Sequence, residues 1–133
     1  MSPLGVPCTK PPWGNLTAID LNTGDHLWQI PLGTSKDLAP FPFWWIKGAP
    51  NIGGPTVTAS GLTFIAATSD FYLRAFNTQT GDELAKFRLP TGGHATPMTF
   101  KTENGRQIVV IAAGGHWAVG SPASDHLIAF ALP

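Results

Sequence analysis

The sequence has little cysteine and little charge. Its single cysteine, Cys8, excludes an intrachain disulfide and a zinc cluster built on cysteines. Charged residues make up 12%, and the 8 basic residues balance the 8 acidic ones, so no charge excess favours nucleic acid or an anionic membrane. No apolar run reaches the roughly 18 residues that a spanning helix needs. No signal-peptide pattern follows Met1, so any exporting or anchoring segment is expected outside these residues.

A long helical pattern is also missing. The chain contains 15 glycines and 13 prolines, which interrupt every stretch long enough for a helix. The hydrophobic fraction of 43% is high enough for a packed core and argues against disorder. Short apolar runs separated by Gly and Pro are typical of short strands joined by turns, so we expect an all-β fold.

The chain does contain a repeat. Leu16-Thr17-Ala18-Ile19-Asp20, closing on Thr23-Gly24-Asp25, returns 57 residues later as Leu73-Arg74-Ala75-Phe76-Asn77, closing on Thr80-Gly81-Asp82. Leu127-Ile128-Ala129-Phe130 begins a third copy. Repeats of this size indicate stacked units that bury their faces against their neighbours.

The strands expected between the turns group into blades of four. They lie at 16–21, 26–32, 55–59, 62–68, 72–77, 83–89, 96–100, 108–113 and 126–132. Four antiparallel strands per repeat describe a β-propeller blade. The sequence therefore predicts a partial propeller with one complete and two incomplete blades, at about 1–33, 51–90 and 94–133. The alternative is a small β-sandwich, which would not require matching Thr-Gly-Asp turns.

A propeller closes with roughly 4–8 blades. We therefore expect these residues to form part of a larger ring, and in isolation to expose apolar faces that favour self-association. Because strands alternate in direction, the loops that follow the second and fourth strands of each blade share one rim. That rim collects the candidate site residues: Asn51, Ile52, Gly53, Asp70, His94, His116 and Trp117.

Each candidate has a functional and a structural interpretation. Asp70 and His116 on adjacent blades could share a pocket and exchange protons. Asp70 could instead cap a turn, and His116 could be an ordinary loop histidine. His94 carries a weaker functional signal than Asp70 and His116. Trp117 does so as well, because tryptophans more often pack against other side chains than bind a cofactor. Gly-Gly pairs permit close backbone approach. The four dispersed histidines do not support a metal site.

Several segments resemble the C-terminal part of the membrane-bound glucose dehydrogenases that depend on pyrroloquinoline quinone (PQQ). The matching segments are Gly5-Val6-Pro7-Cys8, Pro11-Pro12-Trp13-Gly14, Ala18-Ile19-Asp20 with Thr23-Gly24 and Trp28, Pro31-Leu32-Gly33-Thr34, Asn51-Ile52-Gly53-Gly54-Pro55, Ser69-Asp70-Phe71-Tyr72-Leu73-Arg74-Ala75-Phe76, Gly92-Gly93-His94-Ala95-Thr96-Pro97-Met98 and Ala112-Ala113-Gly114-Gly115-His116. The blocks around Cys8 and Asp70 are the most specific.

The resemblance implies a propeller that holds PQQ near its axis at the periplasmic face of the bacterial inner membrane. It implies oxidation of an aldose such as glucose at C1 to the lactone, with electrons passed to ubiquinone and with a divalent cation, Ca²⁺ or Mg²⁺, as Lewis acid. It places Asp70 and His116 in the cofactor and substrate pocket and Ile52-Gly53 beside the quinone.

The sequence also departs from that family. The resemblance implies that the general base, the main metal ligands and the residue that stacks on the quinone belong to blades outside this chain. No catalytic residue and no metal ligand is therefore expected within it. Ala85 stands where the first repeat has Trp28, and His94 stands where the family often has Gln. We therefore expect no dehydrogenase activity from the isolated chain. The competing hypothesis is a propeller-type scaffold that binds partner proteins without catalysis.

Overall fold

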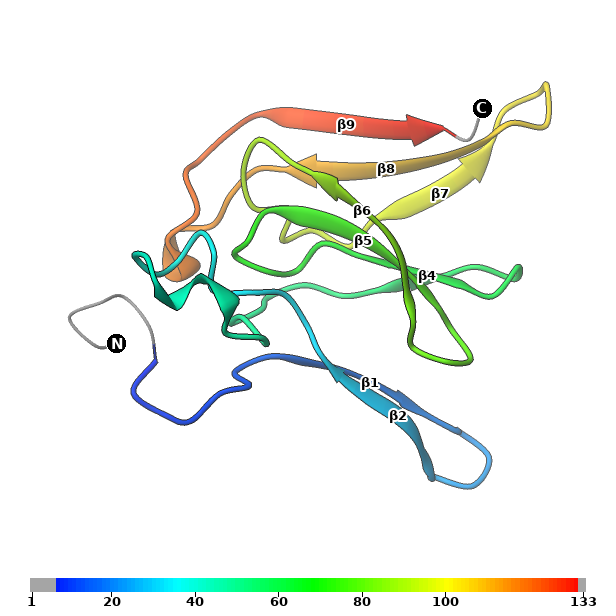
Figure 1. Cartoon of the computed structure of the whole chain (residues 1–133). Coiled ribbons are helices and arrows are strands. Elements are labelled where there is room, and N and C mark those ends of the chain that lie inside the picture. The colour runs from blue at the N-terminus through cyan, green and yellow to red at the C-terminus, as the bar shows by residue number, and fades with distance from the viewer. Residues whose placement is uncertain (1–6, 132–133) are drawn as a thin grey trace.

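Three antiparallel sheets follow one another along the chain (Figure 1). The structure, a computed structural model, describes residues 7–131. The sheets have the strand orders β1-β2, β3-β4-β5-β6 and β7-β8-β9. The strands are β1 (Asn15–Ile19), β2 (His26–Pro31), β3 (Thr56–Val57), β4 (Leu62–Ile65), β5 (Tyr72–Asn77), β6 (Glu83–Arg88), β7 (Met98–Lys101), β8 (Gln107–Ala113) and β9 (His126–Ala131). The predicted all-β partial propeller, with one complete and two incomplete blades, is confirmed; the residue boundaries of the blades remain a prediction.

Two expected strands are each three residues shorter than predicted, which are the largest departures among the described strands. The strand expected at 55–59 is reduced to Thr56–Val57, and the strand expected at 62–68 ends at Ile65. Beyond Ile65 the chain leaves the ladder, because the Ala67 carbonyl accepts a hydrogen bond from the Ile52 amide and Thr68 forms an isolated bridge with Asn51. Burial extends through this segment, so its apolar sequence does not reveal where the strand ends.

Helical structure among residues 7–131 is limited to two single turns of 3-10 helix, η1 (Phe43–Trp45) and η2 (Trp117–Val119). Neither of these is long enough to cross a membrane, and the part of the chain that the structure describes has no other helix.

The sequence repeat is a structural repeat, down to its hydrogen bonds. In the first hairpin the amide of Gly24 donates to the Asp20 carbonyl, and in the second the amide of Gly81 donates to the Asn77 carbonyl. Both glycines have positive φ, +80° and +78°, as the turn requires. Each hairpin also has a bulge at the same place, between Ala18 and Ile19 and 57 residues later in the second hairpin.

The middle sheet is covered on both faces. On one face Ile65, Ala67 and Phe76 pack with residues of the first hairpin. On the other, Leu73 and Ala66 pack with β8. Burial on both faces explains why β4 and β5 have nearly continuous apolar sequences instead of alternating ones.

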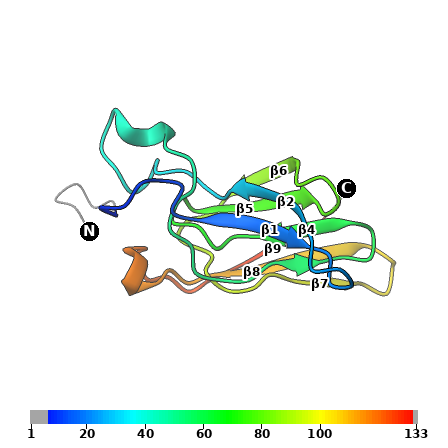
Figure 2. The ribbon, with the colours of Figure 1, turned by 90° about the horizontal axis from the view of Figure 1, so that it is seen from below.

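The two ends of the strands differ in character. The tight hairpin turns lie at one end, to the right in Figure 1, and the long connections that contain η1 and η2 lie at the other. Figure 2 shows the η1 segment (cyan) and the η2 segment (orange) at this same end, on opposite sides of the strand ends. The candidate residues therefore share one rim, as the alternation of strand directions predicts.

Candidate cofactor and substrate rim

Five residues meet at the rim formed by the long connections: Ile52, His94, His116, Trp117 and Ser121, hereafter the rim cluster. They come from the segment before β3, the connection between β6 and β7, and the connection between β8 and β9. The rings of His94 and His116 have centroids 6.1 Å apart and meet edge to face. The second and third blades thus both contribute to one group of residues, the second blade through the Ile52 carbonyl.

His94 is hydrogen-bonded through both ring nitrogens. Its Nδ1 lies 3.3 Å from the carbonyl oxygens of Ile52 and Ala67, and its Nε2 lies 2.7 Å from Ser121 Oγ. Carbonyl oxygens only accept, so Nδ1 carries the proton and the Ser121 hydroxyl donates to Nε2. Burial lowers the pKa of His94 below its ordinary value and the neighbouring His116 acts in the same direction, while the two carbonyls oppose them. The neutral ring is therefore the favoured form.

His116 presents a hydrogen-bond donor at the rim. The Ala118 amide donates to His116 Nδ1 over 3.2 Å, so the neutral ring holds its proton on Nε2. The ring is half-buried and stacks on Trp117, with centroids 6.0 Å apart and planes inclined by 18°. Trp117 itself is 89% exposed. The pair offers a polar N–H beside a broad apolar face, which suits a ligand that has both a flat surface and oxygen atoms.

Glycines permit the close packing around His94. A Cβ on Gly92 would lie 2.2 Å from His94 Nε2 and 2.6 Å from Ser121 Oγ. Gly53, at φ +137°, lies against the His94 carbonyl, where a Cβ would come within 2.8 Å. The close approach expected of the Gly-Gly pairs is thus observed at these positions.

Asp70 occupies a different environment at the same end of the strands. Its carboxylate is fully buried and accepts hydrogen bonds from the Thr34 amide and hydroxyl, from Thr68 Oγ1 and from two nitrogens of Arg74. Burial alone would raise the pKa of Asp70, but Arg74 and the hydroxyl and amide donors outweigh it and hold that pKa below its ordinary value. The carboxylate is therefore ionised and locked into an ion pair.

Asn51 connects the surroundings of Asp70 with the rim cluster along the chain. Asn51 is exposed and pairs with Thr68 through the isolated bridge, and Ile52, 41% exposed, follows it. Among residues 7–131 the polar contacts of the Asp70 side chain are with Thr34, Thr68 and Arg74, and not with the two histidines.

Sequence reasoning missed Arg74 and Ser121. Arg74 carried a signal, because a charged residue inside the apolar run Tyr72–Asn77 predicts a buried partner. Its guanidinium also donates to Glu83 over 3.2 Å. Ser121 carried no signal, since its partner lies 27 residues away in the sequence.

A metal site is not built by these residues. Within the described part of the chain no three His, Cys, Asp or Glu side chains are grouped so that they could hold an ion. A cation in this region would need most of its ligands from elsewhere.

Residues 1–109 match the family model described as the β-propeller domain of glucose, ethanol and alcohol dehydrogenases that use PQQ. The chain belongs to this family of PQQ-dependent propeller dehydrogenases. It is 47% identical over its whole length to the quinoprotein glucose dehydrogenase of Escherichia coli K12. It is 51% identical over 99% of its length to the quinate/shikimate dehydrogenase (quinone) of Acinetobacter baylyi.

The fold agrees with solved structures of the family. The quinohemoprotein alcohol dehydrogenase of Comamonas testosteroni superimposes with a TM-score of 0.61 at 30% identity, over 81% of this chain and 13% of that one. The chain spans 17% of the length of each of the two curated relatives.

Proposed function

We propose that this chain is one sector of a PQQ-dependent dehydrogenase that oxidises an aldose, glucose in particular, at C1 to the lactone. The observation that carries the proposal is the rim cluster, in which the His116 N–H and the Trp117 face stand together at the end of the strands where the long loops gather. A scaffold that only binds protein partners would not require a histidine whose tautomer is set by a backbone amide.

The residues of this chain fit one side of the cofactor and substrate pocket. PQQ, when bound, supplies the two-electron redox chemistry, and a divalent cation, Ca²⁺ or Mg²⁺, supplies Lewis-acid assistance. His116 Nε2 would donate to a substrate or cofactor oxygen, and the Trp117 face would exclude water on that side. Ile52 and Gly53, both exposed, would lie against the ligand. Asp70 would support the pocket indirectly, through its ion pair beneath the loops.

The proposal extends to the protein that carries this sector. The full-length protein would contain the remaining blades, the general base and the metal ligands. It would pass electrons to ubiquinone and would lie at the periplasmic face of the bacterial inner membrane. Identity to both glucose and quinate dehydrogenases supports a polyhydroxylated substrate and a quinone acceptor.

The test is steady-state turnover by the full-length protein after loading with PQQ and Ca²⁺ or Mg²⁺. A ubiquinone analogue would serve as acceptor, and glucose, quinate and ethanol would be compared. We expect the highest kcat/KM with glucose. A preference for quinate would refute the aldose assignment and keep the enzyme class. No PQQ binding and no turnover with any substrate would refute the enzyme and favour the scaffold.

A further inference from the structure

His94 joins segments that are distant in the sequence and belong to two blades. On one side its Nδ1–H donates to the carbonyls of Ile52 and Ala67, which belong to the second blade. On the other its Nε2 accepts from Ser121, in the connection that carries η2. The ring therefore spans the boundary between the blades at the rim.

Ser121 in turn holds the loop of His116. Its amide donates to the His116 carbonyl over 3.2 Å, and the two residues form an isolated bridge. Ser121 is only 5% exposed, so its hydroxyl has little access to water as an alternative partner. A continuous path of hydrogen bonds thus runs from Ile52 through His94 and Ser121 to His116.

Two further bonds fasten the same loop to the residues just before His94. The Gly115 amide donates to the Gly92 carbonyl over 3.0 Å, and Thr91 Oγ1 donates to the Pro122 carbonyl over 2.6 Å. Both bonds join the ends of this loop to residues 91–92. The bonds of His94 are the ones that extend the connection across to Ile52.

We propose that His94 is a positioning residue, which holds the loop of His116 against the Ile52 segment and thereby sets where the His116 N–H meets the substrate. This inference rests on the proposed function. Loss of the His94 bonds loosens the loop, so substrate binding must also order it, and KM rises. Under the proposed function the general base and the metal ligands belong to other blades, so kcat is expected to change less than KM.

The test uses the full-length protein and three variants. We expect His94→Leu, which removes both ring bonds, to raise KM for glucose about tenfold and to change kcat less than about threefold. His94→Gln keeps one donor and one acceptor and is expected to keep KM within about threefold of wild type. Ser121→Ala breaks a single link and is expected to have an intermediate KM. The matched control is His26→Leu, an exposed histidine in β2, which should leave KM unchanged.

A second readout needs no cofactor. Hydrogen exchange measured by mass spectrometry on the PQQ-free protein should be faster in His94→Leu for peptides that cover Ile52 and residues 115–121. Peptides from β5 should exchange as in wild type. If β5 also exchanges faster, His94→Leu has disturbed the whole fold, and His94→Gln and Ser121→Ala decide the question.

Two results would overturn the inference. One is wild-type KM and wild-type exchange in His94→Leu. The other is a His94→Gln variant as impaired as His94→Leu, which would show that the ring acts by packing and not by hydrogen bonding. If the wild-type protein does not turn over at all, the proposed function fails, and the exchange data alone decide whether His94 connects the two segments.

Discussion

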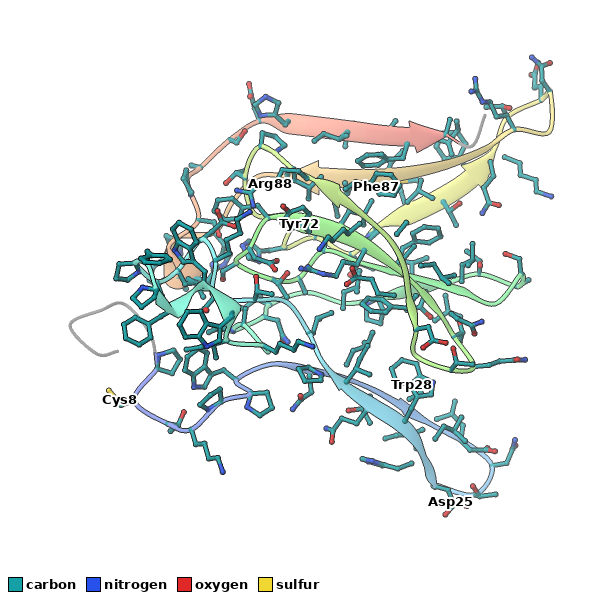
Figure 3. All side chains as sticks on the ribbon, in the orientation of Figure 1. Cys8, Asp25, Trp28, Tyr72, Phe87 and Arg88 are labelled. Atoms are coloured by element: carbon teal, nitrogen blue, oxygen red, sulfur yellow. The ribbon has the colours of Figure 1, made fainter. Side chains whose placement is uncertain are left out.

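Two carboxylates, Asp70 and Asp37, each form an ion pair with an arginine. Because one pair is buried and the other is near the surface, their contributions to stability differ. Asp70 is fully buried with Arg74, whereas Asp37 binds Arg88 in two hydrogen bonds of 2.7 and 2.8 Å near the surface. Figure 3 shows Arg88 beside Tyr72, and its guanidinium lies 5.0 Å from the centre of that ring. Exposed pairs typically contribute under about 1 kcal/mol, whereas breaking a buried pair from one side is far more costly.

We predict that Asp70→Asn lowers the free energy of unfolding by about 3–5 kcal/mol, because it removes the buried counter-charge of Arg74 and leaves the partly exposed Glu83 as its remaining carboxylate partner. Asp37→Asn, the matched exposed control, should cost under about 1 kcal/mol. Thermal unfolding of the two variants in parallel measures the difference. Equal shifts would contradict the structural role given to Asp70.

The same carboxylate makes stability depend on pH. The folded pKa of Asp70 lies below its unfolded value, so its contribution is complete above the unfolded pKa of about 3.9 and is lost as pH falls toward the folded value. We expect the thermal midpoint of wild type to fall on acidification below about pH 4 more steeply than that of Asp70→Asn. Parallel slopes for the two proteins would show that Asp70 does not carry this dependence.

At the scale of elements, the first two blades are joined by Trp28. Its indole nitrogen donates to the Thr78 carbonyl over 3.0 Å, and its ring covers the turn at Gly81. Figure 3 places Trp28 on β2, set back from the hairpin tip at Asp25. The second hairpin thus serves as a docking surface for the first.

This contact can be measured with a matched pair of glycines. Gly81 and Gly24 occupy the same turn position with nearly equal positive φ, but a Cβ on Gly81 would lie 2.8 Å from the Trp28 ring, and one on Gly24 would meet nothing within 4 Å. We predict that Gly24→Ala costs about 1 kcal/mol from backbone strain alone, and that Gly81→Ala costs about 2–3 kcal/mol. The difference between their thermal unfolding midpoints isolates the contact between the blades. Equal costs would show that the Trp28 ring moves away freely.

The second and third blades lack an equivalent tryptophan, because Ala85 occupies that position. An apolar cavity of about 300 Å³ lies between these blades, lined by Leu73, Ala85, Val109, Phe130 and other apolar side chains. We predict that Ala85→Leu raises the free energy of unfolding by about 1 kcal/mol by filling part of this space. Thermal unfolding measures it, with Ala18→Leu in β1 as the control outside the cavity. Destabilisation by Ala85→Leu would show that the cavity cannot accept the added volume.

At the scale of the whole molecule, the outer faces of the first and third sheets have no covering layer among the described residues. Leu27 on the first sheet is 58% exposed, and Leu127 on the third is 73% exposed. We predict that the 133-residue chain, produced alone, associates through these faces, with an average mass that rises with concentration in sedimentation equilibrium. A monomer across the micromolar range would contradict this.

We also predict that the isolated chain, supplied with PQQ, Ca²⁺ or Mg²⁺ and glucose, shows no turnover. Residues 7–131 bring together no group of three His, Cys, Asp or Glu side chains able to hold the divalent cation that the proposed function calls for. The full-length protein under the same conditions is the positive control. Measurable turnover by the isolated chain would show that the described residues suffice.

Local chemistry was enough to predict the strands, the turns and the grouping into blades. Short apolar runs and Thr-Gly-Asp turns are set by a few neighbouring residues, so the strands and turns can be predicted along the chain, and the repeat strengthens the prediction. The largest errors fell on either side of Thr56–Val57 and after Ile65. After Ile65 the chain stays buried although the ladder ends there. Strand ends depend on which backbone partner is nearest, and that partner is distant in sequence.

The partners of the polar side chains were decided by the packing of the blades. The residues near Asp70 in the sequence do not predict Thr34 as its hydrogen-bond partner, and those near His94 do not predict Ser121. Those bonds form because blade packing brings separate loops to one rim, and burial then makes each donor and acceptor depend on its neighbour. Residue types and spacing therefore marked the rim as the candidate site, whereas the division into a locked ion pair around Asp70 and a hydrogen-bonded cluster around His94 arose from contacts between segments dozens of residues apart.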